Sequence, residues 1–314
     1  MIQLYYYVEE FEKVVSMVVS SLLDNLLSEL DKLETLTYDL LDASKIGRFR
    51  NDPDSILLIL EIPYWDKLDN EGIIKQAKAL TAFNSVYGII EFIFSDKPSN
   101  IKNKVNEIKT SVMSFVDQKA SYCLSEIPLS IPEAKEIIKS KFADLHSFLD
   151  CFKSTGEQGF ILIPDANALI KNPDIQTYGR NIESDKYTVI ITPTVLGELD
   201  KLKVVREKEY FREKVESIIN RIKGFRQQGN LLDGIITHKT VTVKTIAKEP
   251  KAEEVLSWLD KDVADDRIIA SALEIQRENL SAKVILVTSD INLQNKAEAA
   301  RLPYIETPEQ KQST

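Results

Sequence analysis

The chain contains few of the residues that build disulfide frameworks or zinc sites. Its 314 residues include only two cysteines and two histidines, His146 and His238, and no CxxC motif occurs. Two cysteines are too few for a disulfide framework, and a zinc site held by His or Cys ligands is not expected. Serine hydrolase chemistry needs a nucleophile–His pair, and nothing near either histidine suggests one. Any catalytic metal would therefore be held by oxygen ligands.

Long apolar runs are also missing. No run reaches the roughly 18 residues that a membrane-spanning helix needs. The first residues, MIQLYYYVEEFEK, are acidic and lack the charged and apolar regions of a signal peptide. We therefore expect a cytoplasmic protein without a membrane partner.

The net charge of −9 is unevenly distributed. Residues 1–155 carry 17 Lys and Arg against 24 Asp and Glu, whereas residues 156–314 carry 23 against 25. Within 201–226, nine basic residues face only four glutamates, a local charge of +5. A local basic patch can attract phosphates even when the whole protein is acidic.

Residues 1–154 and 155–314 differ in pattern, and we predict a domain boundary between them. The polar segment Ser154–Gly159 contains two glycines and is the expected linker. The first part lacks a recognisable chemical motif, an internal repeat or a low-complexity tract. The second part carries the residues on which the functional argument depends.

The first part is predicted to be mostly helical. Apolar residues recur every three or four positions from Phe11 to Leu33, which predicts an amphipathic helix that can extend to about Leu41. The apolar run Ser55–Ile62 fits a strand or a buried helix equally well. Pro98 and Pro132 mark two helix starts. Further helices are predicted at 71–94, 99–119 and 132–152.

After Gly159, short apolar strands alternate with helices. Strands are predicted at 160–164, 188–193, 240–245 and 283–288, with a candidate edge strand at 303–306. Helices are predicted from Ala166 and over about 194–228, 250–259, 263–279 and 291–301. This alternation predicts an α/β fold of three layers, α/β/α, around a parallel sheet. In such sheets the ligand site lies at the carboxyl ends of the strands.

Acidic residues stand at strand ends and helix starts in this part. Asp165 directly follows the strand FILIP, Glu198 lies early in the helix after VIITP, and Asp290 ends VILVTSD. Asp265 and Asp266 open the helix DDRIIASALEIQ. Carboxylates crowded at one sheet edge raise each other's pKa unless a cation lies between them. The pattern therefore suggests Mg²⁺ or Mn²⁺, which prefer oxygen ligands and can activate water for attack on a phosphodiester.

Each of these acids also has a structural explanation. Asp165 and Asp290 are placed to cap the helices that follow them, and Asp265 and Asp266 can do the same. Glu198 in a first helical turn complements the helix dipole. The occurrence of such acids after successive elements of one α/β unit favours the functional interpretation.

A family resemblance becomes visible in the order of four segments, PDANALI, TPTVLGELDKLK, DDRIIASAL and VTSDINLQNKA. This order resembles the PIN domain nucleases over about 158–306 and leaves residues 1–154 unmatched. The individual motifs are short, and their order and spacing carry the resemblance. It implies a Mg²⁺- or Mn²⁺-dependent ribonuclease.

The resemblance also implies roles for individual residues. Asp165, Glu198, Asp266 and Asp290 would bind metal and position the attacking water. Four neighbours would support them: Asn167 by hydrogen bonds to the first Asp, Asp265 beside the aligned Asp266, and Thr288 and Ser289 by shaping the last strand end.

The basic residues that follow Glu198 are the candidate RNA contacts. They are Lys201, Lys203, Arg206, Lys208, Arg212 and Lys214, and Arg221, Lys223 and Arg226 continue the series. Such contacts give salt-dependent affinity without sequence preference. A solvated helix face is the alternative explanation. Phe225 could stack on a base, although a core position is the stronger expectation.

These observations together predict an endonucleolytic ribonuclease, with residues 1–154 targeting or regulating it through a protein partner. A structure-selective DNA nuclease is the alternative among enzymes. A regulatory module that retains an acidic pocket without catalysis is the alternative of another class. The sequence does not decide whether the protein forms a homodimer.

Overall fold

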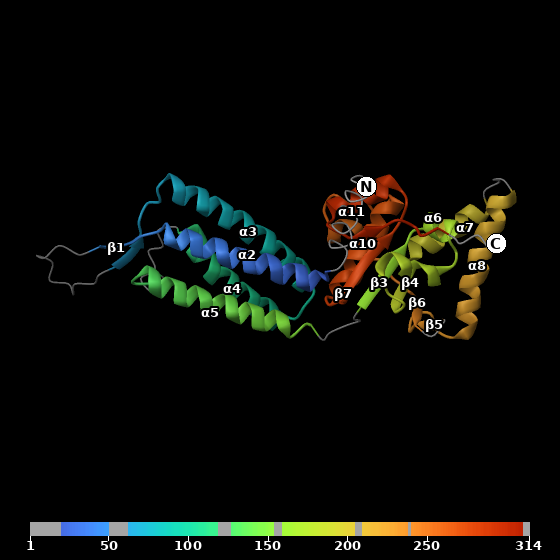
Figure 1. Ribbon diagram of the computed structural model, residues 1–314, viewed down its shortest axis with the longest axis horizontal. Helices are drawn as coiled ribbons and strands as arrows, with labels where there is room; N and C mark the ends of the chain where they lie inside the picture. The colour runs from blue at the N-terminus through green and yellow to red at the C-terminus, as the bar shows by residue number, and fades with distance from the viewer. Residues whose placement is uncertain are drawn as a thin grey trace, which may run out of the picture. The chain divides into compact units, whose positions relative to one another are not determined.

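The computed structural model describes residues 20–49, 62–118, 127–153, 159–204, 209–237 and 240–309 (Figure 1). The chain divides into two compact units, Leu23–Lys153 and the part from Ser154 onward, and each is described by itself. Among the described residues, no helix is both long enough and apolar enough to cross a bilayer.

The first unit is a bundle of four helices (Figure 1). They are α2 (Leu22–Asp42), α3 (Asn70–Phe94), α4 (Ser99–Asp117) and α5 (Ile131–Asp150). The inner face of α2 is a leucine row, Leu23, Leu26, Leu30, Leu33 and Leu40, each at most 1% exposed. The three- and four-residue spacing of these leucines places them on one side of the helix, where they form the core of the bundle.

Local sequence signals define where two of these helices begin. The Asp69 carboxylate accepts a hydrogen bond from the Gly72 N–H at the start of α3. At the start of α5, the Ser130 hydroxyl accepts from the Glu133 N–H, and the Glu133 carboxylate accepts from the Leu129 N–H. These bonds satisfy backbone donors that have no partner within the helix. The predicted helices at 71–94, 99–119 and 132–152 are confirmed to within two residues at each end.

Two predictions for this unit need correction or stay outside the structure. The predicted helix is interrupted at Ser20 and Ser21, which are not helical, and α2 begins at Leu22. Residues 11–19 lie outside the described residues, as does most of the run Ser55–Ile62. The structure adds an antiparallel pair of strands that the sequence did not predict, β1 (Ile46–Phe49) and β2 (Ile62–Trp65). Each of these strands has only four residues, too few for the alternating pattern of a strand to be recognised in the sequence.

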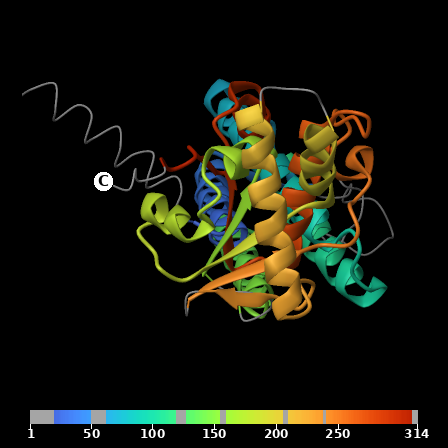
Figure 2. The same cartoon turned by 90° about the vertical axis from the view of Figure 1, so that its right-hand side faces the viewer.

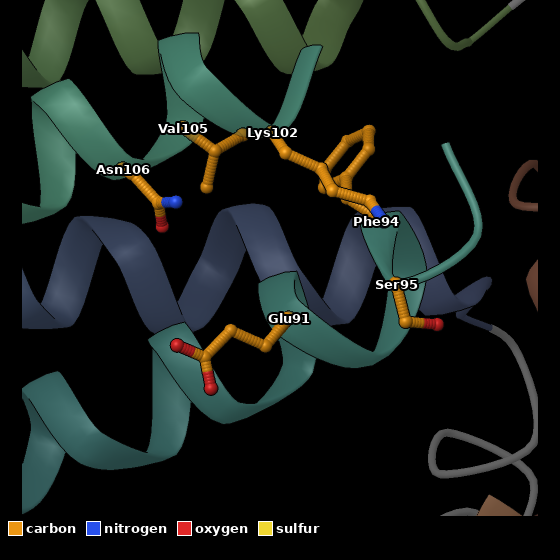
Figure 3. Close-up of a pocket in the computed structure, with 6 residues that line it drawn as sticks. All are labelled: Glu91, Phe94, Ser95, Lys102, Val105 and Asn106. Carbon is orange, nitrogen blue, oxygen red and sulfur yellow. The ribbon is translucent and has the colours of Figure 1, made fainter. Parts of the chain in front are cut away.

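A shallow hollow lies between α3 and α4 of the helical unit (Figure 3). Phe94 and Val105 form its apolar floor, and the side chains around them are polar. The Lys109 ammonium and the Glu91 carboxylate form an ion pair between the two helices. The hollow is lined by Glu91, Phe94, Ser95, Lys102, Val105 and Asn106.

The second unit is built on a six-stranded sheet with the order β5-β6-β4-β3-β7-β8. The strands are β3 (Gly159–Pro164), β4 (Tyr187–Ile191), β5 (Ile235–Thr237), β6 (Val241–Thr245), β7 (Ala282–Val287) and β8 (Tyr304–Ile305). All neighbours pair in parallel except β5, which is antiparallel to β6 at one edge. The predicted strands are thereby confirmed, and β5 is an addition.

Helices cover this sheet (Figures 1 and 2). They are α6 (Ala166–Lys171), the 3₁₀ helix η1 (Ile175–Ile182), α7 (Pro193–Val204), α8 (Glu209–Gln228), α9 (Ala252–Val255), α10 (Ala264–Glu278) and α11 (Ile291–Ala299). Among them, α6 packs on β3, α8 on β5 and α10 on β7. The central strand β4 is buried along its whole length, as expected for a parallel strand with both faces covered.

The predicted single helix over 194–228 is wrong. The segment forms two helices, α7 and α8, which pack against each other side by side (Figure 2). A continuous helix of this length would extend about 50 Å, far beyond strands of five or six residues that span about 20 Å. Because α8 packs beside α7 instead of continuing it, α8 buries Val215, Ile218, Ile219, Ile222 and Phe225.

The strand order creates one position at which the sheet is suited to hold a ligand. The chain passes from β3 to β4 and β6 on one side, then crosses to β7 and β8 on the other side of β3. Because successive connections leave β3 and β7 in opposite directions, a crevice forms outside their carboxyl ends. The residues that follow β3 and β7 therefore face the candidate site.

Candidate active site

Asp165 follows β3 and lies at the centre of the site. Its backbone N–H donates to the carbonyl oxygen of Val287 at 3.1 Å, which continues the pairing of β3 with β7 by one residue. One side-chain oxygen caps α6 by accepting from the Ala168 N–H, and the other accepts from the Thr288 hydroxyl. The side chain is only 4% exposed. Asp165 therefore serves as a helix cap and also as a buried carboxylate with a fixed orientation.

Thr288, the residue after β7, links two of the predicted acids. Its hydroxyl donates to Asp165 and accepts from the Asp290 N–H at 3.0 Å. Its own N–H donates to the Ile305 carbonyl of β8, so the threonine is held by the sheet. The Asp290 carboxylate caps α11 by accepting from the N–H groups of Asn292 and Leu293. Within the sequence TSD, the Thr288 hydroxyl thus holds Asp165, and the capping bonds to α11 hold Asp290.

Two further supporting residues behave differently. Asn167, expected to support Asp165 by hydrogen bonds, is exposed, and the bonds to Asp165 come from Thr288 and Ala168 instead. Ser289 is exposed as well, and its hydroxyl accepts from the Lys171 ammonium and from the Thr307 N–H.

Glu198 projects from the second turn of α7, whose start is fixed by a network absent from the sequence prediction. The Glu249 carboxylate, in the segment after β6, accepts from the Thr194 N–H. The Arg267 guanidinium of α10 donates to the Thr194 hydroxyl at 3.0 Å and lies 3.9 Å from the Glu249 carboxylate. The network ties the start of α7 to the start of α10. Glu249 lies a few residues beyond the end of β6 and Arg267 lies inside α10, so neither stands directly at a strand end, where the strand-end rule could have selected it.

Asp265 and Asp266 occupy different surroundings at the start of α10. Asp266 is 5% exposed, and one of its oxygens accepts from the Asp260 N–H at 2.9 Å. Its other oxygen lies 2.7 Å from the ammonium of Lys296 on α11. Asp265 is half-buried and lies 3.4 Å from the same ammonium. Asp266 therefore holds neighbouring segments together, whereas Asp265 keeps more of its carboxylate free.

Lys296 is a third residue that the sequence did not single out. Burial alone lowers its pKa, but the hydrogen bond to Asp266 and the negative charges of both acids outweigh this effect and raise it. The lysine therefore stays charged and compensates part of the negative charge at the start of α10. Its position within α11, away from any strand end, gave no reason to select it from the sequence.

The carboxylates influence one another electrostatically. Burial raises the pKa of Asp165, and the charges of Asp290 and Asp265 raise it further against the hydrogen bonds from Thr288 and Ala168. Burial also raises the pKa of Glu198, together with the charges of Asp265 and Asp165, while Arg267 and Lys201 lower it. Like charges therefore face one another across the carboxyl ends of β3 and β7. A divalent cation with oxygen ligands would relieve this repulsion, so the residues fit such an ion.

The basic residues are divided between the two helices. Lys201 and Lys203 are exposed on α7, and Lys201 is close enough to Glu198 to affect its pKa. Arg212 is exposed on α8, while Lys214 stacks over the Tyr210 ring with its ammonium 4.7 Å from the ring centre. Arg206 and Lys208 lie outside the described residues.

The later part of α8 serves structure. Arg221 pairs with Asp174 at 3.1 Å, next to the start of η1. Phe225 is 8% exposed, which confirms the expected core position. The basic series is therefore not one continuous face.

Another group of potential metal ligands lies in the helical unit. Asp31 and Glu34 of α2 and His146 of α5 have ligand atoms within 4.8 Å of one another, the one such group of three among the described residues. The His146 imidazole lies 3.1 Å from the Asp31 carboxylate, and Asp31 is exposed. An ion pair between two helices at the surface accounts for this group, and it is separate from the acids of the α/β unit.

Comparison with known proteins bears on the second unit. The chain matches no curated protein. A family model described as PIN domain matches residues 162–307, a range that contains all of the acids described above. Residues 162–307 therefore form a PIN domain, and domains of this family are generally metal-dependent nucleases.

Proposed function

We propose that the protein is a Mg²⁺- or Mn²⁺-dependent endoribonuclease. The observation that carries the proposal is the gathering of buried and half-buried acids at the carboxyl ends of the central strands, where, beyond burial, Asp290 and Asp265 raise the pKa of Asp165, and Asp265 and Asp165 raise the pKa of Glu198. Folding brings these carboxylates together at a cost in electrostatic energy, which a bound cation offsets. The PIN domain match supports the same activity.

Four carboxylates are the proposed ligand set: Asp165, Glu198, Asp265 and Asp290. Asp265 replaces Asp266, the residue that the family resemblance favours, because the charge of Asp265 raises the pKa of both Asp165 and Glu198, whereas Asp266 is paired with the Lys296 ammonium at 2.7 Å. When bound, the ion would lower the pKa of a water molecule and neutralise charge that develops on the phosphodiester.

The chain's own residues orient the reacting groups. Thr288 holds one oxygen of Asp165, and the Ala168 N–H holds the other, so the carboxylate cannot rotate freely. Asp266 and Lys296 anchor the start of α10, and the Arg267–Glu249 network anchors the start of α7. Preorganisation of this kind reduces the entropy that the reaction would otherwise lose.

RNA is the proposed substrate, and the helical unit is the proposed targeting or regulatory part. Lys201 and Lys203 are exposed on the helix that carries Glu198, which favours a polyanionic substrate. A homodimer and a protein partner for the helical unit belong to the same proposal. A cytoplasmic location fits an RNA substrate.

The decisive experiment compares substrates and metals. End-labelled single-stranded RNA, single-stranded DNA and flapped DNA are incubated with the protein in Mg²⁺, in Mn²⁺ and in chelator. Internal cuts in RNA that require metal and disappear in Asp165→Asn support the proposal, and the variant excludes a contaminating nuclease. Preferential cutting of flapped DNA would support the structure-selective alternative. Intact substrates throughout would leave the non-catalytic regulatory module.

A further inference from the structure

Trp258 is an exposed aromatic residue in the segment that leads into α10. Its side chain is 47% exposed, whereas tryptophan is highly buried on average in folded proteins. Leu259, the next residue, is 2% exposed and anchors the segment in the core. A single exposed apolar side chain is common on protein surfaces, so the surroundings of Trp258 decide whether it has a binding role.

The segment that presents Trp258 is held firmly beside the acids. The Asp260 N–H donates to the Asp266 carboxylate at 2.9 Å, and the Arg267 guanidinium donates to the Lys261 carbonyl at 2.6 Å. The Leu259 N–H donates to the Leu256 carbonyl at 3.0 Å. The first two bonds fix the segment to the first turn of α10, which also carries Asp265, and the third closes a turn within the segment. Trp258 is therefore presented by an ordered loop.

The surroundings of this loop suit a nucleic-acid strand. The loop belongs to the connection between β6 and α10, which leaves the sheet at the carboxyl end of β6. Exposed Val263 comes two residues before Asp265, and exposed Ile291 directly follows Asp290. Lys261 is also exposed, and the exposed Asp260 and Asp262 flank it on the same loop. Apolar side chains thus adjoin the carboxylates, as the stacking of unpaired bases requires.

We propose that Trp258 is a stacking platform for a base of single-stranded RNA whose backbone passes the acidic site. The inference rests on the proposed nuclease function and adds a substrate contact to it. Every base has an aromatic face, so stacking on Trp258 tolerates any sequence. In a duplex the bases already stack on one another, so the platform favours unpaired over paired RNA.

The chain offers a direct optical test because it contains two tryptophans. Trp65 is 8% exposed in the helical unit, and Trp258 is the exposed one. Binding is measured with the full chain in Mg²⁺ in an Asp165→Asn background, so that substrate is not turned over. A single-stranded oligouridylate and a duplex of equal length are titrated while tryptophan emission and the anisotropy of labelled RNA are recorded.

Single-stranded RNA should quench the tryptophan emission, and Trp258→Phe should remove that quenching while Trp65 remains. Trp258→Ala should weaken single-strand binding by about tenfold, whereas Trp258→Phe should keep most of the affinity. Ile236→Ala on the edge strand β5, at a residue 68% exposed, is the matched control and should bind as the parent does. The melting temperature of each variant shows that it is folded.

The inference is overturned if single-stranded RNA binds without quenching, if Trp258→Ala binds as tightly as the parent, or if no RNA binds. A duplex that quenches as strongly as the single strand also overturns it. Its failure is distinguishable from that of the nuclease function. If a Trp258→Ala protein with an otherwise intact site cleaves RNA with an unchanged KM, only the stacking role of Trp258 is refuted. If RNA quenches the emission but the wild-type chain does not cleave it, only the nuclease function is refuted.

Discussion

The two units bury polar groups in different ways. In the helical unit, the buried hydroxyls of Thr37 in α2 and of Ser44 just beyond its end donate to the carbonyls of Leu33 and Leu40, four residues earlier in the chain. In the PIN domain, the buried groups include two carboxylates, Asp165 and Asp266. A hydroxyl bonded to a nearby backbone carbonyl costs little, whereas a buried carboxylate needs a compensating partner. Asp266 has Lys296, while Asp165 faces other acids.

The difference indicates where each unit's sequence serves stability and where it serves chemistry. The bundle's leucine core obeys the ordinary rule that apolar groups are inside. The PIN domain breaks that rule at one sheet edge, and this local departure from good packing marks a functional site. If this contrast holds, neutralising an acidic side chain of the site in the PIN domain should reduce cleavage, whereas neutralising one in the helical unit should leave cleavage unchanged.

The largest effect is expected from Asp165→Asn. Cleavage should fall by more than about 100-fold, because even residues that only support metal ligands cost 10- to 100-fold when mutated. Metal-free Asp165→Asn should melt no lower than the wild type, since Asn can still cap α6 and the repulsion is relieved. Asp31→Asn in the helical unit is the control and should cleave normally. A metal-saturated Asp165→Asn protein with full activity would refute the site.

The adjacent acids Asp265 and Asp266 sharpen the comparison within the PIN domain itself. We expect Asp265→Asn to reduce turnover by about 10- to 100-fold and to weaken metal affinity. Asp266→Asn should mainly lower the melting temperature, because it leaves Lys296 without a full partner and loosens the bond to Asp260. Turnover and melting temperature across a Mn²⁺ titration check both. A dead, stable Asp266→Asn beside an active Asp265→Asn would restore the family-based assignment.

Much of the PIN domain could be predicted because its signals are local. Apolar strands after Gly159, with one acid directly behind FILIP and another ending VILVTSD, predict both the sheet and the edge where Asp165 and Asp290 lie. The division of 194–228 into α7 and α8 was missed because it depends on the length of the strands that the helices cover. The strand β5, three residues long, exists only through its pairing with β6.

The positioning residues of the site were harder to predict. Lys296, Arg267 and Glu249 lie within helices or a loop, and only the tertiary fold brings them to the acids. The choice between Asp265 and Asp266 turns on about 100° of helix rotation, a difference that motif alignment does not decide. The sequence is enough to predict the edge of the sheet where the acids lie, but the contacts of each acid are needed to distinguish their roles.

A smaller effect is expected from the basic residues of α7. Replacing Lys201 and Lys203 with Gln should weaken RNA binding and flatten the slope of log affinity against log salt by about 1.4, or roughly 0.7 per charge on a single strand. Lys139 and Lys141 of the helical unit, replaced together by Gln, are the matched control with the same loss of charge. An unchanged slope in the α7 variant would assign its lysines to a solvated face.

The smallest effect concerns the pH dependence of stability in the metal-free protein. The pKa of Glu198 is raised in the folded state, so its contribution to stability is fully present below the unfolded pKa and is lost as pH rises through the folded pKa. Glu198→Gln should therefore melt higher than the wild type near neutral pH, and this advantage should shrink as the pH falls toward 4. Glu213→Gln, at an exposed glutamate of α8, is the same chemical change away from the acids and should show no such trend. Thermal melts in chelator between pH 4 and pH 7 measure both differences. An advantage of Glu198→Gln that stays constant with pH, or grows toward acid, would mean that Glu198 does not share the repulsion that separates the PIN domain from the helical bundle.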